Sequence, residues 1–293
     1  MSSTVARDVR RLVGASKLIA LRAPANSALG DRRSKAVGSG IEFAQYRDYE
    51  PGDDLRHLDR HVYARFGRTA IRQYHVEQRL RVTVLLDASG SMGVDPTSWR
   101  RAVELASAIG TAAVNGGDQV RFAVATGSRI DWGNIATREA QLWQALSRVE
   151  ATRTVGGDGT LSDTAFRSLE KLTHPGLLVV IGDWLVDDYE SALKSWQVRG
   201  QEIVALQVLG SSETGPLAGP TGWLRLVDAE TGDAVERRAD VTTWQYYRAA
   251  VADWSDRVRA AVWAVEGRWL SVAAASQFDE VTVRSMRGLG LIT

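Results

Sequence analysis

The stretch V-T-V-L-L-D-A-S-G-S-M-G at residues 82–93 decides the fold that the sequence predicts. Its first half is a short, continuous run of Val and Leu, which is typical of a strand buried on both faces of a parallel sheet. The run stops at Asp87, and two hydroxyl side chains follow at alternate positions, Ser89 and Ser91. Because open α/β sheets form their sites at the carboxyl ends of strands, we expect these side chains in a loop at such an edge.

The oxygens of Asp87, Ser89 and Ser91 can converge on one point, since they stand at positions i, i+2 and i+4. A hard divalent cation such as Mg²⁺ prefers oxygen ligands in octahedral geometry and keeps several waters. The same residues also fit a plain strand followed by a Ser/Gly turn, in which the aspartate caps the next helix. The stretch alone leaves both interpretations open.

The composition is that of an ordinary globular protein of 293 residues, with 44% hydrophobic and 24% charged residues. The chain is long enough to bury a core, and no apolar run approaches the roughly 18 residues of a membrane span. Charged residues at positions 7, 8, 10 and 11 argue against a signal peptide, so we expect a cytoplasmic location. The absence of cysteine excludes disulfides and thiolate chemistry.

The net charge of +1 is unevenly distributed along the chain. Residues 1–80 hold 15 Lys/Arg and 9 Asp/Glu, whereas residues 81–293 hold 21 and 26. This basic excess is interrupted by acidic residues and is far weaker than the stripe of a dedicated nucleic-acid-binding protein. A solvated surface is therefore favoured, and no nucleic-acid partner is predicted.

The first 80 residues predict an extension to the main domain. Apolar side chains recur at spacings of three and four over residues 4–20, which predicts an amphipathic helix packed on that domain, followed by a mobile polar loop over 22–40. Residues 41–78 mix aromatic residues with paired charges. We expect there a Pro-Gly turn, a short helix capped by Asp53 or Asp54, and a strand at 69–77. This segment is either a surface rich in ion pairs or a docking face.

Strand and helix patterns alternate from residue 79 onward. This alternation predicts an α/β fold with a doubly wound, mainly parallel sheet and right-handed crossovers. The expected strands are 79–87, 119–126, 176–181, 202–209 and 268–275, the expected helices are 99–114, 138–149, 162–172, 188–198, 242–265 and 279–289, and a hairpin is expected at 224–227 and 234–237. The predicted organisation is therefore a helix and loop at 1–37, an extension at 38–80 that packs on the main domain, and the main domain at 81–293.

Two further oxygen-bearing residues are expected at the same edge of the sheet. Asp183 follows the strand at 176–181, and Thr160 begins a helix after the Gly-rich segment G-G-D-G-T at 156–160. Loops after neighbouring parallel strands open on the same edge. The candidate metal ligands are therefore Asp87, Ser89, Ser91, Thr160 and Asp183, a set from three loops that is much more specific than D-x-S-x-S alone.

These motifs resemble the metal-ion-dependent adhesion site of von Willebrand factor A domains: D-A-S-G-S at 87–91, Thr160 in its Gly-rich loop, and V-V-I-G-D-W at 179–184. The segments G-I-E-F-A-Q-Y-R-D-Y-E-P-G-D-D-L-R-H-L-D at 40–59, A-R-F-G-R-T at 64–69 and V-R-S-M-R-G-L-G-L-I at 283–292 resemble the domain-of-unknown-function-58 family, in which such a domain follows the first of these blocks. Arg60 departs from the Trp usual there, and G-G-D-G-T departs from the usual G-G-T.

The resemblance implies a von Willebrand factor A-like, Rossmann-like domain that binds Mg²⁺ or Mn²⁺. Ser89, Ser91 and Thr160 would reach the metal directly or through water, and Asp87 and Asp183 would mostly hold coordinating waters. One coordination position would stay open for a carboxylate from a partner protein. Relatives are typically encoded beside MoxR-type AAA+ ATPases, so the resemblance implies an adaptor or cofactor that works with such an ATPase or its client.

The competing interpretations are an enzyme and a scaffold that binds no metal. A haloacid-dehalogenase-like phosphohydrolase using Asp87 would need a second carboxylate at position 89, where Ser stands, and a Lys at a fitting strand end. The chain has no G-x-S-x-G elbow and its four histidines lie outside the motif loops. We therefore expect no catalysis. We also expect Asp187 or Asp188 to cap a helix, and Trp184 to border the open face of the metal site.

Overall fold

The computed structural model describes residues 2–21, 33–38, 42–77, 79–127, 129–154, 159–214 and 219–293. The chain divides into two compact units, one formed by residues 1–20 with 80–293 and the other by residues 21–79. The N-terminal segment therefore belongs to the same unit as the main domain. None of the helices in the described ranges is long and apolar enough to cross a membrane.

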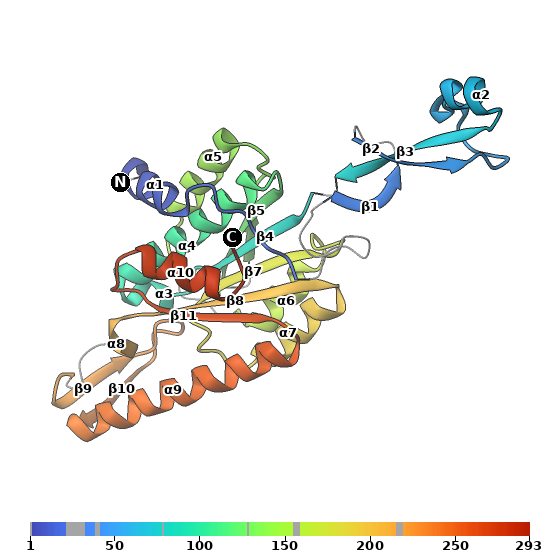
Figure 1. Cartoon of the computed structure of the whole chain (residues 1–293). Coiled ribbons are helices and arrows are strands. Elements are labelled where there is room, and N and C mark those ends of the chain that lie inside the picture. Colours follow the sequence, from blue (N-terminus) through green and yellow to red (C-terminus); the bar gives the residue numbers. More distant parts are fainter. Residues whose placement is uncertain are drawn as a thin grey trace. The chain divides into compact units, whose positions relative to one another are not determined.

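The larger unit is built on a six-stranded sheet in the order β11-β8-β7-β4-β5-β6 (Figure 1). Five strands run parallel, and the edge strand β6 (Arg129–Trp132) pairs antiparallel with its neighbour. The parallel strands are β4 (Arg81–Asp87), β5 (Gln119–Thr126), β7 (Gly176–Gly182), β8 (Gln201–Leu209) and β11 (Arg268–Ala273). The predicted α/β fold with a mainly parallel sheet is confirmed.

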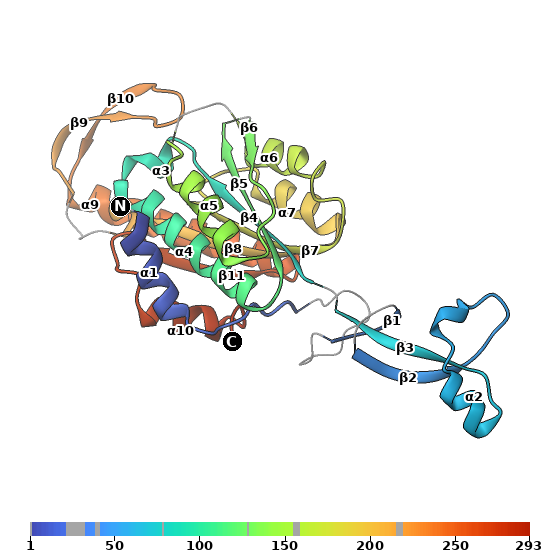
Figure 2. The same cartoon turned by 90° about the horizontal axis from the view of Figure 1, so that it is seen from above.

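Helices cover both faces of this sheet (Figure 2). Val84 and Leu86 of β4 face the core that the sheet shares with α1 (Ser2–Val13), α4 (Pro96–Asn115), α5 (Glu139–Glu150) and α10 (Glu280–Gly288). Leu85 faces the second core, which includes α6 (Leu161–Ser168), α7 (Tyr189–Val198) and α9 (Val241–Ala264). Because both faces are buried, the strand is apolar at successive positions instead of alternating.

The first turn of α4 is held by Asp95, which stands directly before Pro96. Its side chain accepts hydrogen bonds from the Thr97 amide and, 116 residues further on, from the Ser211 amide, both at 2.8 Å. The capping residue of the long helix after β4 is therefore Asp95, so the interpretation of Asp87 as a helix cap is wrong. Between them lies the four-residue helix α3 (Ser91–Val94), which has no side-chain cap at its N-cap Gly90.

The N-terminal helix ends earlier than predicted, at Val13, because Gly14 adopts the left-handed conformation with φ of +56°. The chain then runs in extended form beside the C-terminus, where Leu18 forms a bridge with Ile292. The Asn115 side-chain amide at the end of α4 donates to the Gly14 carbonyl at 2.8 Å. The predicted packing of this segment on the main domain is thereby achieved by a helix and an extended tail together.

A two-stranded hairpin of β9 (Gly222–Val227) and β10 (Ala234–Ala239) precedes α9, close to the predicted ranges. The strands do not join the six-stranded sheet. A further short helix, α8 (Ser211–Thr214), follows β8.

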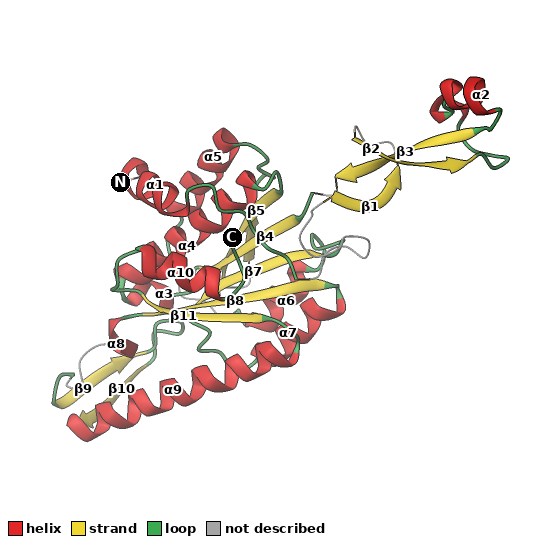
Figure 3. Ribbon diagram, in the orientation of Figure 1, coloured by secondary structure: helices red, strands yellow, loops and turns green. Residues whose placement is uncertain are grey.

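The smaller unit is a three-stranded antiparallel sheet in the order β1-β3-β2, with a 3₁₀ turn η1 (Leu55–His57) and a helix α2 (Arg60–Phe66) (Figure 3). Its strands are β1 (Arg33–Gly38), β2 (Glu42–Asp48) and β3 (Ala70–Glu77). The strand β3 and the turn capped by Asp54 agree with the prediction, whereas β2 and α2 were not predicted. The loop prediction is wrong for residues 33–38, since pairing with β3 overrides their polar composition, and residues 22–32 and 39–40 lie outside the described ranges.

Asp59 organises the paired charges of the smaller unit. The residue is only 2% exposed to solvent. Its carboxylate accepts hydrogen bonds from Arg72 Nε at 2.7 Å, the Tyr46 hydroxyl at 2.8 Å and the His61 amide at 2.7 Å. These bonds, the one from Arg72 above all, hold the pKa of Asp59 well below its usual range. Charged residues of this segment therefore stabilise the fold of the smaller unit itself.

Candidate functional site

The ends of β4 and β7 lie side by side where the strand order reverses. The chain passes from β4 to β5 on one side, whereas β7, β8 and β11 follow on the other. Crevices outside the carboxyl ends of strands at such a switch point are where open α/β sheets bind ligands. Asp87 is the last residue of β4 and Asp183 comes directly after β7, so both carboxylates stand at this point.

A cavity of about 180 Å³ opens at this edge, and all the predicted site residues line it. They are Asp87, Ser89, Ser91, Thr160 and Asp183, and they are joined by a residue that the sequence did not indicate, Glu230. The three loops named in the sequence analysis therefore meet around one hollow.

The loop after β4 arranges its oxygens through a short hydrogen-bond chain. The Ser89 amide donates to Asp87 Oδ1 at 2.9 Å, and the hydroxyl oxygens of Ser89 and Ser91 lie 3.0 Å apart. Burial raises the pKa of Asp183, and Ser91 acts to lower it. Asp87 and the two serines thus form a short polar network at the end of β4.

Asp183 is fixed by contacts from its own loop and from β8. Its Oδ1 accepts a hydrogen bond from the Leu185 amide at 3.0 Å, and its carbonyl accepts one from the Gln207 side chain at 2.9 Å. Gln207 is fully buried and is itself bonded to the Ser271 hydroxyl of β11 at 2.9 Å. The backbone of Asp183 is therefore tied to β8 and, through Gln207, to β11.

Trp184 does not border the site, and that expectation is wrong. The residue takes a left-handed backbone conformation with φ of +59°, which is uncommon outside glycine. With this backbone conformation, the indole lies in the core, and Trp184 is 3% exposed. Its ring packs edge-to-face on the ring of Trp269, with 6.0 Å between the ring centroids. Its carbonyl accepts a hydrogen bond from Trp254 Nε1 at 2.9 Å. Leu185 and Val186 line the cavity in its place.

Thr160 is the N-cap residue of α6, with its hydroxyl accepting a hydrogen bond from the Asp163 amide at 3.0 Å. Of the Gly-rich segment 156–160, only Gly159 and Thr160 lie within the described residues, and both line the cavity. Asp188 is the N-cap residue of α7, as predicted, although its side chain makes no capping bond to that helix. Its carboxylate instead accepts from the Ser162 amide at 2.6 Å and so caps α6 together with Thr160.

Glu230 reaches the site from the tip of the β9–β10 hairpin. Its Oε1 accepts a hydrogen bond from the Ser91 amide at 2.8 Å, and its Oε2 accepts one from the Gly90 amide at 3.1 Å. The two segments are 139 residues apart in the sequence. The turn that holds Glu230 is recognisable in the sequence, but no sequence pattern indicates which part of the domain this turn contacts.

The site concentrates negative charge at a partly buried position. Burial, followed by the charge of Asp183, raises the pKa of Asp87 to about 7. Burial also raises the pKa of Asp183, to which the charges of Glu213 and Glu230 contribute. The described residues that line the cavity include no Lys, Arg or His. A bound cation would relieve this repulsion and favour the ionised carboxylates.

The donor set fits a hard divalent cation. It consists of carboxylate and hydroxyl oxygens, without the nitrogen or sulfur ligands that zinc prefers. Within the described ranges, no three His, Cys, Asp or Glu side chains cluster as a metal-binding group. A cation here would therefore depend on the serine and threonine hydroxyls and on water as much as on the carboxylates.

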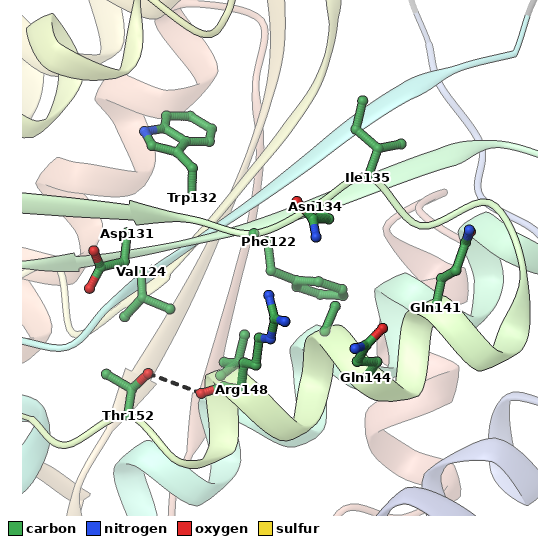
Figure 4. A pocket seen from close by; sticks show the side chains of 13 residues that line it. Phe122, Val124, Asp131, Trp132, Asn134, Ile135, Gln141, Gln144, Arg148 and Thr152 are labelled. Atoms are coloured by element: carbon green, nitrogen blue, oxygen red, sulfur yellow. Dashed lines mark hydrogen bonds between the residues drawn. The ribbon is translucent and has the colours of Figure 1, made fainter.

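A second cavity, of about 250 Å³, lies between β5, β6 and α5 (Figure 4). Gln141, Gln144 and Arg148 line it from the helix, opposite Phe122. None of the predicted site residues lies there, and its described lining residues offer only one carboxylate, that of Asp131, among amides, a hydroxyl, a guanidinium and apolar side chains. The chemistry that the sequence indicates is confined to the cavity at the β4–β7 edge.

Comparisons with known proteins match most of the chain. The family described as "Protein of unknown function DUF58" matches residues 45–257. The uncharacterized proteins Rv1480 of Mycobacterium tuberculosis (strain ATCC 25618 / H37Rv) and Mb1516 of Mycobacterium bovis (strain ATCC BAA-935 / AF2122/97) are each 28% identical over 240 residues, which cover 78% of this chain and 74% of theirs.

Two solved structures from Bacteroides species also resemble the chain. One is the conserved hypothetical protein BatB from Bacteroides thetaiotaomicron, with 14% identity and a TM-score of 0.43. The other is an aerotolerance-related membrane protein from Bacteroides fragilis NCTC 9343, with 14% identity and a TM-score of 0.42. Each comparison covers 72% of this chain and 98% of the other.

Proposed function

The chain belongs to the family of proteins of unknown function DUF58, and we propose that it is a non-catalytic, divalent-metal-dependent protein-binding module of the cytoplasm. Its larger unit acts as a von Willebrand factor A-like domain, and the edge between β4 and β7 is its metal-ion-dependent adhesion site. The observation that carries the proposal is the convergence of Asp87, Asp183 and three hydroxyls on one cavity without a described cationic side chain.

Ser89, Ser91 and Thr160 would hold Mg²⁺ or Mn²⁺ through their hydroxyls, directly or through water. Asp87 and Asp183 would hold coordinating waters, since each carboxylate already accepts a hydrogen bond from a backbone amide, of Ser89 and of Leu185 respectively. The bound metal would supply an electrophilic centre for a carboxylate from outside the chain. Neutral hydroxyl ligands suit this role, because they leave more positive charge on the metal than carboxylate ligands would.

The proposed partner is a MoxR-type AAA+ ATPase or its client, with an Asp or Glu side chain directed at the site. This choice rests on the resemblance of residues 40–59, 64–69 and 283–292 to the DUF58 family. The chain would then be an adaptor whose attachment depends on the metal.

The test is capture of a purified MoxR-type ATPase from the same genome by the immobilised chain, with Mg²⁺ and with EDTA. We expect capture in Mg²⁺, loss in EDTA, and loss in the Ser89→Ala/Ser91→Ala double variant. The control is Ser195→Ala/Ser285→Ala, which removes hydroxyls that donate to carbonyls of their own helices. Capture that is indifferent to EDTA and to both double variants would contradict the proposal.

A separate assay addresses the phosphohydrolase alternative. The proposal predicts no hydrolysis of p-nitrophenyl phosphate by the purified chain in Mg²⁺. Hydrolysis that disappears in Asp87→Asn would establish an enzyme in place of a binding module.

A further inference from the structure

The hairpin tip brings an acidic side chain to the candidate metal site from within the same chain. Glu230 lines the cavity together with Asp87 and the two serines. Both of its carboxylate oxygens accept hydrogen bonds from the loop that carries those serines, at 2.8 Å and 3.1 Å. This is the same functional group that a partner would have to present there.

The turn that presents Glu230 is well organised. The side chain of Asp228 accepts hydrogen bonds from the amides of Glu230 at 2.8 Å and Thr231 at 3.0 Å. Gly232 takes a left-handed conformation, with φ of +77°, and its amide donates to the Asp228 carbonyl at 2.9 Å. The carboxylate is therefore held out from a closed turn toward the site.

A purely structural role, in which Glu230 caps the short helix α3, would account for the two amide bonds but not for the rest of the arrangement. The side chain lies against the same cavity as the candidate ligands, and its negative charge acts on both Asp87 and Asp183. Placing a further carboxylate beside two others is unfavourable unless a cation compensates it.

Resting on the proposed metal site, we propose that Glu230 is an internal carboxylate ligand that occupies the position open to a partner. An acidic side chain of the partner would bind the metal by displacing Glu230. The strength of the Glu230 contact would therefore set the affinity that a partner needs in order to bind. The chain would thereby reject weak carboxylates and accept a partner that also contacts the surface around the site.

The hairpin is built in a way that permits this displacement. It consists of two strands that are separate from the six-stranded sheet (Figures 1 and 2). Nearly all residues of these strands are partly or fully exposed. A two-stranded hairpin contributes little stability by itself. The tip can therefore leave the site while the core stays folded.

The test uses Mn²⁺ alone as the probe and compares wild type with Glu230→Gln and Glu236→Gln. Glu236 is an exposed residue of the same hairpin outside the cavity lining, so its variant is the matched control. Glutamine can keep one of the two amide hydrogen bonds through its single carbonyl oxygen, so part of the cap remains while the ligand charge is removed. The readouts are the dissociation constant of Mn²⁺ and the water-proton relaxation enhancement, which reports water bound to the metal.

We expect Glu230→Gln to bind Mn²⁺ several-fold more weakly and to show a higher relaxation enhancement per bound Mn²⁺, which added acetate then lowers. Wild type and Glu236→Gln are expected to match each other and to respond little to acetate. Asp228→Ala, which loosens the turn without touching the cavity, is expected to shift in the same direction as Glu230→Gln.

Two adverse results are distinguishable. If wild type binds Mn²⁺ through Asp87 but Glu230→Gln and Asp228→Ala match it in affinity, enhancement and acetate response, the inference is overturned and the metal site stands. If wild type does not bind Mn²⁺ at all, the proposed function and the inference fail together.

Discussion

Gly182 approaches Asp87 so closely that no side chain fits between them. A Cβ added to Gly182 would lie 2.8 Å from the Cβ of Asp87 and 3.1 Å from its Oδ2. The two residues end neighbouring strands, β7 and β4, and Gly182 immediately precedes Asp183. The absence of a side chain at position 182 is therefore what allows the two carboxylates to stand together at the switch point.

Substitution of this glycine is expected to disable the site and to lower the stability of the fold. Gly182→Ala must push Asp87 out of place, because the contact is with the first carbon of a buried strand end and cannot be relieved by a flexible tip. We expect at least a tenfold loss of Mg²⁺ affinity by calorimetric titration and a destabilisation of about 1–3 kcal/mol. Gly288→Ala, at a position with open space around it, should leave both quantities unchanged. Unchanged affinity in Gly182→Ala would show that the close approach is irrelevant to the site.

The raised pKa of Asp87 predicts an unusual pH dependence in metal-free protein. With a folded-state pKa of about 7 against an ordinary value of about 3.9, this group favours folding at low pH and loses that contribution as pH rises toward 7. In EDTA at pH 8, Asp87→Asn should therefore have a higher melting temperature than wild type, and the difference should shrink as the pH falls toward 4.

The control for this measurement is Asp131→Asn, which changes an exposed carboxylate paired with Arg129. It should alter the melting temperature little at either pH. A lower melting temperature for Asp87→Asn at pH 8 without metal would contradict the electrostatic description of the site.

The pKa of Asp95 is shifted in the opposite direction to that of Asp87, so the contribution of Asp95 to stability depends on pH in the opposite way. Hydrogen bonds, first from the Thr97 hydroxyl and also from the amides of Thr97 and Ser211, hold its pKa well below the usual range. Its contribution is present above the ordinary carboxyl pKa and is lost as pH falls below it. Asp95→Ala should lower the free energy of unfolding by about 1–2 kcal/mol at pH 7 in urea titrations, and by less at pH 3. Asp256→Ala, in an exposed pair with Arg259, should cost less than about 0.5 kcal/mol.

Arg268 joins both ends of the chain to the sheet. Its guanidinium donates to the carbonyls of Ile19 at 3.1 Å and Gly290 at 2.5 Å, and it pairs with Glu202. Both charged side chains are about 5% exposed or less. Arg268→Ala leaves the Glu202 carboxylate buried without this partner, so we expect a loss of about 3–5 kcal/mol in urea unfolding, against almost none for Arg129→Ala. A loss below about 1 kcal/mol would mean that the termini are held by other contacts.

The sequence predicts what depends on local spacing and on strand ends. The apolar run before Asp87 indicates a strand covered on both faces, and the alternation of strands and helices indicates which strand ends share an edge. The spacing of Asp87, Ser89 and Ser91 predicts that their oxygens lie close together. Asp183 is predicted to lie at the same edge because it directly follows the buried strand β7. These residues line one cavity because parallel strands bring their carboxyl ends together.

The remainder depends on backbone turns and long-range docking that composition does not encode. Trp184 looks like a neighbour of the site in the sequence, but its left-handed backbone turns the indole into the core. Residues 33–38 look like a loop, but they gain a partner in β3. Glu230 belongs to a turn that is recognisable locally, whereas its contact with Ser91 depends on the path of the whole hairpin.

The measurement that tests the metal site most directly is the melting temperature of the purified chain as a function of Mg²⁺ concentration. Binding to the folded state alone stabilises it by mass action, so the melting temperature of wild type should rise with Mg²⁺, by the equivalent of about 2.7 kcal/mol at one hundred times the dissociation constant. Asp87→Ala should abolish the rise. A flat titration of the wild-type chain, with Mg²⁺ and with Mn²⁺, would contradict a metal site between β4 and β7.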